Sequence, residues 1–212
     1  LNIPVLGINT GRLGFLATIQ KEEIKQVIEQ LLLKEYKIQE RTLLSVKTTP
    51  KTAELSEINF ALNEVTVGRK NTTSMIGVQT FLDDEYLTNY WSDGLIISTP
   101  TGSTGYSLSC NGPVVLPDSN SLVITPIAPH NLNARPLVIS ENTKIKLEVS
   151  GRENKFLMSL DSRIVTISEN TQIFIEKAAF TIKTISLTNQ SFLKTLRSKL
   201  LWGEDTRNDF KH

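Results

Sequence analysis

The feature that most constrains the fold is a long series of short segments with high strand propensity. From about Arg41 to Leu187, pieces rich in Val, Ile, Leu, Phe and Thr alternate with Gly, Pro, Asn and Asp. Such spacing is typical of an all-β sandwich or a related pair of sheets. The predicted strands cover residues 42–48, 64–68, 75–82, 95–99, 121–128, 136–140, 143–151, 164–168, 172–178 and 180–187. We therefore predict a β-rich domain over residues 41–188.

The beginning of the chain has a different pattern. The run "IPVLGI", residues 3–8, predicts a short buried strand because its apolar residues do not alternate with polar ones. Residues 20–37 predict an amphipathic helix, since apolar side chains recur at helical spacing. These side chains are Ile24, Val27, Ile28, Leu31 and Leu32. A strand followed by a helix indicates an α/β arrangement over residues 1–40.

A further helix is predicted near the end of the chain, over residues 191–202. Ser191 is a suitable N-cap, and Leu193, Leu196 and Leu200 share one face. We expect this helix to dock on another part of the structure and the tail after it, residues 203–212, to be frayed. Residues 189–212 are thus predicted to return to the N-terminal segment.

Composition limits the expected binding partners and the expected cellular compartment of the protein. The chain has 212 residues, with 23 Lys and Arg against 22 Asp and Glu and a net charge of +1, so nothing favours nucleic acid or an acidic membrane surface. The single cysteine, Cys110, excludes an internal disulfide, and no apolar run is long enough to span a bilayer. We expect a cytoplasmic protein.

Common catalytic and metal motifs are missing from the sequence. The two histidines, His130 and His212, cannot form a zinc site with one cysteine. No serine lies in a G-x-S-x-G turn, which argues against an α/β-hydrolase triad. The candidate site must therefore come from other segments.

The strongest candidate is the hydroxyl-rich turn in "SDGLIISTPTGSTGYSLS", residues 92–109. Gly102 and Gly105 let a ligand approach the backbone closely, and the hydroxyls between them form hydrogen bonds without adding charge. This chemistry suits a ribose or an adenine edge better than a phosphate. Tyr106 could place its ring against a flat base. The alternative is a plain Gly/Ser/Thr turn beside a core tyrosine.

Two further segments are weaker candidates. In "ALNEVTVG", Asn63 and Glu64 interrupt an apolar strand, and an adjacent amide and carboxylate can bind both hydroxyls of a ribose. The alternative is a pair of solvated residues at a strand end. In "GINTGRLGFL", the glycines lack the spacing of a dinucleotide fingerprint, and a tight turn explains them equally well.

Taken in order, five segments resemble the NAD kinase (ATP-NAD kinase) family through nearly the whole chain. They are "GINTGRLGFL", the "NE" pair, "SDGLIISTPTGSTGYSLS", "TPIAPHNLNARPLVI" and "FLKTLRSKLLW". The resemblance implies transfer of the γ-phosphoryl group of ATP to the adenosine ribose 2′-hydroxyl of NAD, which gives NADP. It also implies dependence on Mg²⁺ or another divalent cation and a homodimer or homotetramer.

For the fold, the resemblance implies the remnant of an N-terminal α/β, Rossmann-like nucleotide domain over residues 1–40. A β-sandwich-like NAD-binding domain follows over residues 41–188, and the C-terminal helix, residues 189–212, packs back. The overall fold class is thus α/β plus all-β.

The resemblance also assigns roles to residues of the candidate site. Asn63 and Glu64 should hold the adenosine ribose, and Asp93 should meet the second nucleotide half, in some relatives across a subunit interface. The residues expected to surround the adenine and its ribose are Thr101, Thr104, Gly105 and Tyr106. Further candidates for the wall of the site are Gly11, Ser103, Ser107 and His130.

The sequence departs from the family pattern at several points. The G-G-D-G-T loop, whose aspartate is thought to activate the 2′-hydroxyl, is absent from these 212 residues, so no catalytic base is assigned. The chain opens on Leu1, and we expect the loop to belong upstream. Trp91 stands where many relatives carry arginine, which leaves the preference between NAD and NADH open. Gly105 replaces a common alanine, a change we expect to be silent.

Two other functions are compatible with parts of the pattern. A diacylglycerol or sphingosine kinase has a β-rich second domain but lacks the "STPTGSTGYS" block. A non-enzymatic NAD(P) sensor would bind the nucleotide without turnover. The sequence also leaves open whether ATP or polyphosphate is the phosphoryl donor.

The absent loop generates the first prediction. The isolated 212-residue chain should form little or no NADP from NAD and ATP, because it lacks the aspartate that the resemblance places at the 2′-hydroxyl. Steady NADP formation by this chain in a coupled assay would contradict that expectation.

Overall fold

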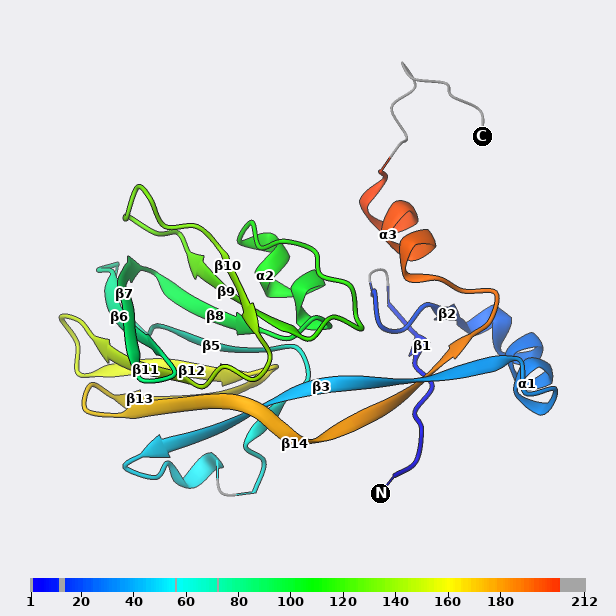
Figure 1. Cartoon of the computed structure of the whole chain (residues 1–212), viewed down its shortest axis with the longest axis horizontal. Helices are drawn as coiled ribbons and strands as arrows, with labels where there is room; N and C mark the ends of the chain where they lie inside the picture. The colour runs from blue at the N-terminus through cyan, green and yellow to red at the C-terminus, as the bar shows by residue number, and fades with distance from the viewer. Residues whose placement is uncertain (1, 12–13, 56, 72, 203–212) are drawn as a thin grey trace, which may run out of the picture. The chain divides into compact units, whose positions relative to one another are not determined.

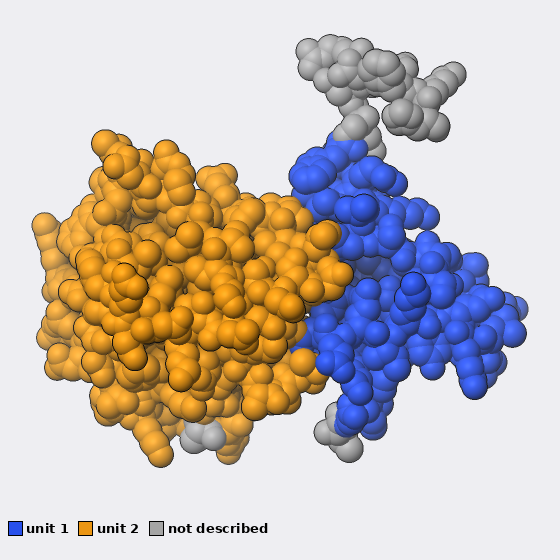
Figure 2. All heavy atoms as spheres, viewed as in Figure 1, with its two compact units in different colours: residues 1–41, 182–212 blue, residues 42–181 orange. Residues whose placement is uncertain are grey.

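The computed structural model describes residues 2–11, 14–55, 57–71 and 73–202. The chain divides into two compact units, coloured separately in Figure 2. Unit 1 comprises residues 1–41 and 182–212, and unit 2 comprises residues 42–181. The expected combination of a small α/β segment with a sheet-rich domain is confirmed.

Unit 2 is built on two six-stranded sheets that face each other (Figure 1). In the first sheet the strand order is β10-β9-β8-β5-β12-β13, and every neighbouring pair is antiparallel. Its strands are β5 (Glu64–Arg69), β8 (Gly94–Ser98), β9 (Ser121–Ile127), β10 (Leu137–Ser140), β12 (Lys155–Leu160) and β13 (Arg163–Ser168).

The second sheet has the order β4-β3-β14-β11-β6-β7. Its strands are β3 (Tyr36–Thr49), β4 (Phe60–Ala61), β6 (Ile76–Leu82), β7 (Glu85–Ser92), β11 (Ile145–Ser150) and β14 (Gln172–Leu187). The long strands β3 and β14 run beyond residues 42–181, so each contributes residues to both units.

The main hydrophobic core lies between the two sheets. Val65, Val67 and Ile97 from the first sheet pack in one cluster with Val78 and Leu147 from the second. Alternation in β11, where Ile145, Leu147 and Val149 are buried, matches the two-residue period of a strand with one face in the core.

Strand β8 is different because every one of its five residues is buried. One face meets the core, and the short helix α2 (Tyr106–Ser109) contacts β8 from the other side (Figure 1). Coverage of both faces explains why "LII", residues 95–97, is continuously apolar. It also brings the hydroxyl-rich turn, which includes the 3₁₀ turn η3 (Gly102–Thr104), onto the sheet.

Unit 1 contains short elements around a small core of Ile19, Val27 and Leu187. The strands β1 (Ile8–Asn9) and β2 (Ile19–Gln20) are parallel, and Val5 bridges Thr184 of β14. The 3₁₀ turn η1 (Lys21–Glu23) leads into α1 (Ile24–Leu32), and α3 (Phe192–Leu200) closes the described chain.

Several boundaries differ from the sequence-based expectations. The buried strand predicted for residues 3–8 is wrong, because Ile3, Val5 and Ile8 are exposed and only Ile8–Asn9 form a strand. The helix predicted for 20–37 ends at Leu32, because Lys34 adopts a left-handed conformation and β3 begins at Tyr36. The two segments predicted at 172–178 and 180–187 form one strand, β14, since no turn residue separates them. The tail, residues 203–212, lies outside the described residues.

The predicted helix stripes are only partly buried. In α1, Val27 is buried, whereas Leu32 is 79% exposed. In α3, Ser191 accepts a hydrogen bond from the Lys194 backbone N–H at 3.1 Å, as the N-cap prediction requires, and Leu196 is buried while Leu193 is exposed. None of the helices in the described ranges is long and apolar enough to cross a lipid bilayer.

Candidate functional site

Two candidate segments that are far apart in the sequence lie side by side in unit 2. Strands β5 and β8 pair so that Glu64 faces Ser98. Just beyond this pair, the Thr99 backbone N–H donates to the Asn63 carbonyl oxygen at 2.9 Å, and the Thr99 hydroxyl donates to the Leu62 carbonyl at 2.6 Å. The "NE" pair and the hydroxyl-rich turn therefore form one local structure.

Gly102 is the point of closest approach between these segments. Its N–H donates to the Thr99 hydroxyl oxygen at 3.1 Å. A Cβ at this position would lie 2.0 Å from the Asn63 carbonyl oxygen, which belongs to the backbone and cannot turn aside. Only glycine fits here without displacing the loop that carries Asn63 and Glu64.

The loop is held from its other side by Asp161, in the turn between β12 and β13. The Asp161 carboxylate accepts hydrogen bonds from three backbone N–H groups: Leu62 at 2.9 Å, Asn63 at 2.7 Å and Glu64 at 3.2 Å. The Asp161 N–H in turn donates to the Glu64 carbonyl oxygen at 2.9 Å. This set fixes the backbone conformation of the ribose-binding candidates.

Asp161 itself is supported by Arg163. The guanidinium lies 3.9 Å from the Asp161 carboxylate and donates hydrogen bonds to the carbonyl oxygens of Ile58, Phe60 and Leu160. Sequence reasoning missed both residues, because "DSR" resembles an ordinary polar turn between strands. The left-handed conformation of Asp161 is consistent with such a turn, and its long-range partners cannot be found from sequence spacing.

Glu64 occupies a partly enclosed position in this structure. Burial raises the pKa of its carboxyl group, the negative charge of Asp161 raises it further, and a hydrogen bond from the Tyr106 backbone lowers it. Its Oε2 atom is buried and has no hydrogen-bond donor among the described residues. A Cβ on Gly105 would lie 2.9 Å from this oxygen, so Gly105 covers the carboxylate closely.

The hydroxyls of the turn serve mainly to hold its shape. The buried Ser103 hydroxyl donates to the Pro100 carbonyl at 2.7 Å and accepts from the Val115 N–H at 3.0 Å. Ser107 is also buried, and its hydroxyl lies 2.8 Å from that of Thr125. The side chains of Ser103 and Ser107, expected as wall residues, are therefore engaged inside the protein.

Only a small part of the turn is open to solvent. Thr101 and Thr104 are half-buried, and the Thr104 hydroxyl donates to the Thr101 carbonyl oxygen at 3.2 Å. Gly105 and Tyr106 are exposed, with 46% of Tyr106 accessible. These are the positions of the turn from which a ligand is within reach.

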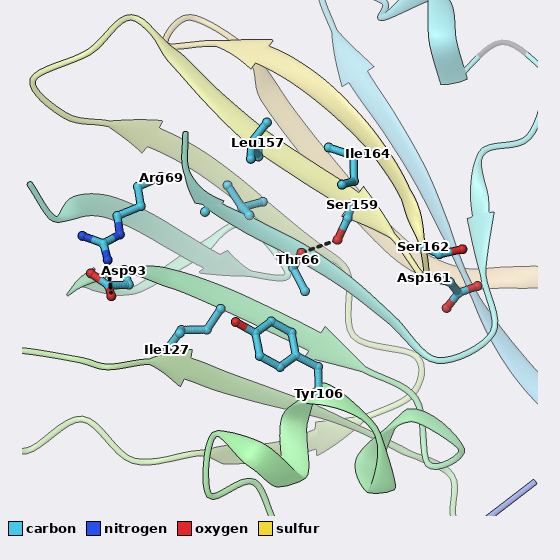
Figure 3. Close-up of a pocket in the computed structure, with 12 residues that line it drawn as sticks. Thr66, Arg69, Asp93, Tyr106, Ile127, Leu157, Ser159, Asp161, Ser162 and Ile164 are labelled. Carbon is cyan, nitrogen blue, oxygen red and sulfur yellow. Dashed lines mark hydrogen bonds and ion pairs between the residues drawn. The ribbon is translucent and has the colours of Figure 1, made fainter. Parts of the chain in front are cut away.

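A pocket of about 390 Å³ lies beside Tyr106 on the first sheet (Figure 3). Among the predicted site residues, Asp93 and Tyr106 line it, whereas Asn63, Glu64, Thr101, Thr104 and Gly105 do not. The complete lining is Thr66, Val67, Gly68, Arg69, Asp93, Tyr106, Ile127, Leu157, Ser159, Asp161, Ser162 and Ile164.

The pocket combines charged and hydroxyl side chains with apolar surface. An Arg69 Nη2 atom lies 3.1 Å from Asp93 Oδ2, while Ile127, Leu157 and Ile164 supply apolar surface. Burial raises the pKa of the Tyr106 hydroxyl, with smaller contributions from Cys110 and Asp93, so the phenol keeps its proton at neutral pH. Sequence reasoning missed Arg69 because nothing in its strand marks it as different from a surface residue.

Two remaining wall candidates lie outside this pocket's lining. His130 is exposed, and its backbone N–H donates to the Trp91 carbonyl oxygen at 2.8 Å. Gly11 belongs to unit 1, where its N–H donates to Asn9 Oδ1 at 2.9 Å. Within the described part of the chain, no three His, Cys, Asp or Glu side chains are grouped to bind a metal ion, so we assign no protein ligand to Mg²⁺.

The fold places a hydroxyl-rich turn against an amide–carboxylate pair at the edge of two facing sheets. Comparison with known proteins identifies the family. The ATP-NAD kinase C-terminal domain matches residues 62–187, and the ATP-NAD kinase N-terminal domain matches residues 1–36. The chain belongs to the NAD kinase family.

Individual relatives agree with this assignment. The chain is 61% identical over 206 residues to the NAD kinase of Flavobacterium psychrophilum, covering 97% of this chain and 70% of that protein. It is 63% identical over 208 residues to the NAD kinase of Christiangramia forsetii, covering 98% of this chain and 71% of that protein.

Solved structures extend the similarity to more distant proteins. Yeast NADH kinase complexed with NADH matches with a TM-score of 0.84 and 26% identity, covering 99% of this chain and 61% of that one. An NAD kinase from Archaeoglobus fulgidus in complex with ATP matches with a TM-score of 0.78 and 27% identity, covering 93% of this chain and 74% of that one.

The close contact at Gly102 predicts a large difference between two glycine substitutions. Gly102→Ala should lower the free energy of unfolding by about 3 kcal/mol or more, because the new methyl group meets backbone. Gly105→Ala, the matched control, should cost less than about 1 kcal/mol, because the Glu64 side chain can move. Denaturant unfolding of both variants measures this, and equal losses of stability would contradict the packing described.

The environment of Glu64 predicts a pH-dependent cost to stability. Its pKa is raised in the folded protein, so the folded state holds this proton more tightly, and stability is lost as pH rises from the ordinary value of 4.5 through the raised pKa. Glu64→Gln should therefore raise the Tm near pH 7 and have almost no effect near about pH 4. Thermal unfolding at the two pH values tests this; a gain of the same size at both would contradict it.

Proposed function

We propose that unit 2 supplies the NAD-binding site of an NAD kinase, which phosphorylates the 2′-hydroxyl of the adenosine ribose with ATP to give NADP. The observation that carries the proposal is the locked arrangement of residues 62–64 against residues 99–106. The names of the relatives support the reaction, and the NADH and ATP complexes of similar proteins support the two classes of substrate.

The ribose is the first part of the ligand that the site can recognise. Asn63 offers amide donors and an acceptor, and Glu64 offers a carboxylate. Because Glu64 Oε2 has no donor among the described residues, a ribose hydroxyl reaching this carboxylate would supply a hydrogen bond that the protein alone does not make. Asp161 and Thr99 hold the backbone at both residues. Ligand binding therefore loses little conformational entropy by ordering this loop.

The adenine base is the second part of the ligand that the site can recognise. Tyr106 presents an exposed ring beside the turn, and Thr101, Thr104 and Gly105 form the accessible edge next to it. We assign these four residues to the adenosine, and Asp93, which also lines the pocket, to the second nucleotide half. Stacking on the ring and hydrogen bonds to the edge would orient the adenosine.

The chemical role of such a site is positioning. In phosphoryl transfer the protein holds the acceptor oxygen in line with the donor and compensates charge, with little covalent chemistry of its own. Mg²⁺ supplied with ATP would neutralise the phosphates, and the described residues orient the acceptor ribose. ATP as donor, assembly into a homodimer or homotetramer, and a cytoplasmic location belong to this proposal.

Calorimetric titration with NAD and NADP tests the binding site. The unchanged chain should show saturable binding, and Tyr106→Ala should weaken it by about tenfold because a stacking surface is lost. Tyr86→Ala is the matched control, since Tyr86 is also exposed and lies in β7, outside the pocket lining. Equal weakening by both variants, or absence of binding by the unchanged chain, would contradict the proposal.

A further inference from the structure

In the pocket, Asp93 forms an ion pair with Arg69, a residue to which the proposed function gives no role. Arg69 ends β5, and Asp93 immediately precedes β8, so the two residues project from neighbouring strands of one sheet (Figure 3). Their side chains meet at 3.1 Å, and the Arg69 backbone N–H donates to the Asp93 carbonyl oxygen at 3.1 Å. Both side chain and backbone hold the pair together.

The pair lies where its charge would act on a ligand bound in the pocket. Both residues line the pocket, and about a third of each side chain is exposed, 35% for Arg69 and 30% for Asp93. The third charged lining residue, Asp161, is already engaged with the N–H groups of residues 62–64 and with Arg163. The charge near Tyr106 and Ile127 is therefore set mainly by Arg69 and Asp93.

Arginine is suited to cancelling the charge of Asp93 permanently. A guanidinium stays protonated at every physiological pH, and its remaining N–H groups can still donate to a ligand after one nitrogen has paired with a carboxylate. Trp91, two residues before Asp93, carries no charge, and its backbone N–H donates to Asn131 at 2.7 Å. In this chain the cation beside Asp93 comes from β5.

The two forms of the nucleotide differ in charge at the ring that Asp93 is proposed to meet. The oxidised nicotinamide ring carries one positive charge, and the reduced ring carries none. An unpaired carboxylate would attract the oxidised ring by Coulomb energy that the reduced ring lacks. A carboxylate already paired with a guanidinium discriminates less.

We infer that Arg69 is a specificity-determining residue, which neutralises Asp93 and so lets the pocket accept the reduced nucleotide alongside the oxidised one. The inference rests on the proposed function, because it requires the nicotinamide half to lie near Asp93. Acceptance of both the oxidised and the reduced nucleotide then depends on one ion pair.

The test compares affinities for NAD and NADH, measured by calorimetric titration of the full chain. Arg69→Gln should shift the ratio of the two affinities toward NAD by about three- to tenfold, since it exposes the charge of Asp93 at a half-solvated site. Arg69→Lys, the matched control, keeps the positive charge and should leave the ratio within about twofold. Raising the salt concentration should shrink the shift caused by Arg69→Gln.

A second variant tests whether the effect of Arg69→Gln comes from the charge of Asp93 or from the changed shape of the pocket. Asp93→Asn removes the carboxylate, so adding Arg69→Gln to it should no longer shift the ratio toward NAD. Circular dichroism of each variant confirms folding, which both partly exposed positions should tolerate. If the unchanged chain binds neither nucleotide, the proposed function is overturned and this inference with it. If it binds both and Arg69→Gln leaves the ratio unchanged, the role of Arg69 alone is overturned.

Discussion

The candidate site depends on one carboxylate that accepts hydrogen bonds from three successive backbone N–H groups. Asp161 reaches from the β12–β13 turn to residues 62–64, at the start of the neighbouring strand β5. A loop with its N–H groups engaged in this way cannot relax into a regular strand end. Its carbonyl groups are consequently left to face the following turn, where Thr99 binds two of them and Gly102 packs against one.

This arrangement has an energetic cost at Glu64. The same backbone geometry places that carboxyl group near Asp161 and beneath Gly105, where burial and like charge disfavour its ionised form. A protein selected for stability alone would have an uncharged residue here. The cost is reasonable if Glu64 is kept for a ligand, and it agrees with the general observation that binding residues occupy unfavourable environments.

Much of the fold could be predicted from the sequence, because strand periodicity and turn residues are local signals. The strand predicted at 95–99 is confirmed by β8, and Ser191 correctly indicated a helix start. Strands β7 and β12 were missed, since "EYLTNYWS" and "KFLMSL" mix polar and apolar residues irregularly. The helix stripe of α1 also predicted more burial than Leu32 has.

The site was predictable only in part, and for a different reason. Short motifs identified the segments around Glu64 and Tyr106, but the direction in which a hydroxyl points depends on its surroundings. Ser103 and Ser107 are therefore engaged inside the turn, although their composition suggested ligand contacts. Asp161 and Arg69 act through partners 24 to 99 residues away, which no local pattern reveals.

We propose that the locked loop and turn hold the adenosine of NAD, and a crystal structure of the chain grown with NAD tests this placement. The adenosine ribose should lie within hydrogen-bonding distance of Asn63 and Glu64, with residues 101–106 next to the base and the Asp161 hydrogen bonds unchanged. Density for the adenosine at another place in the molecule, away from Glu64 and Tyr106, would contradict it.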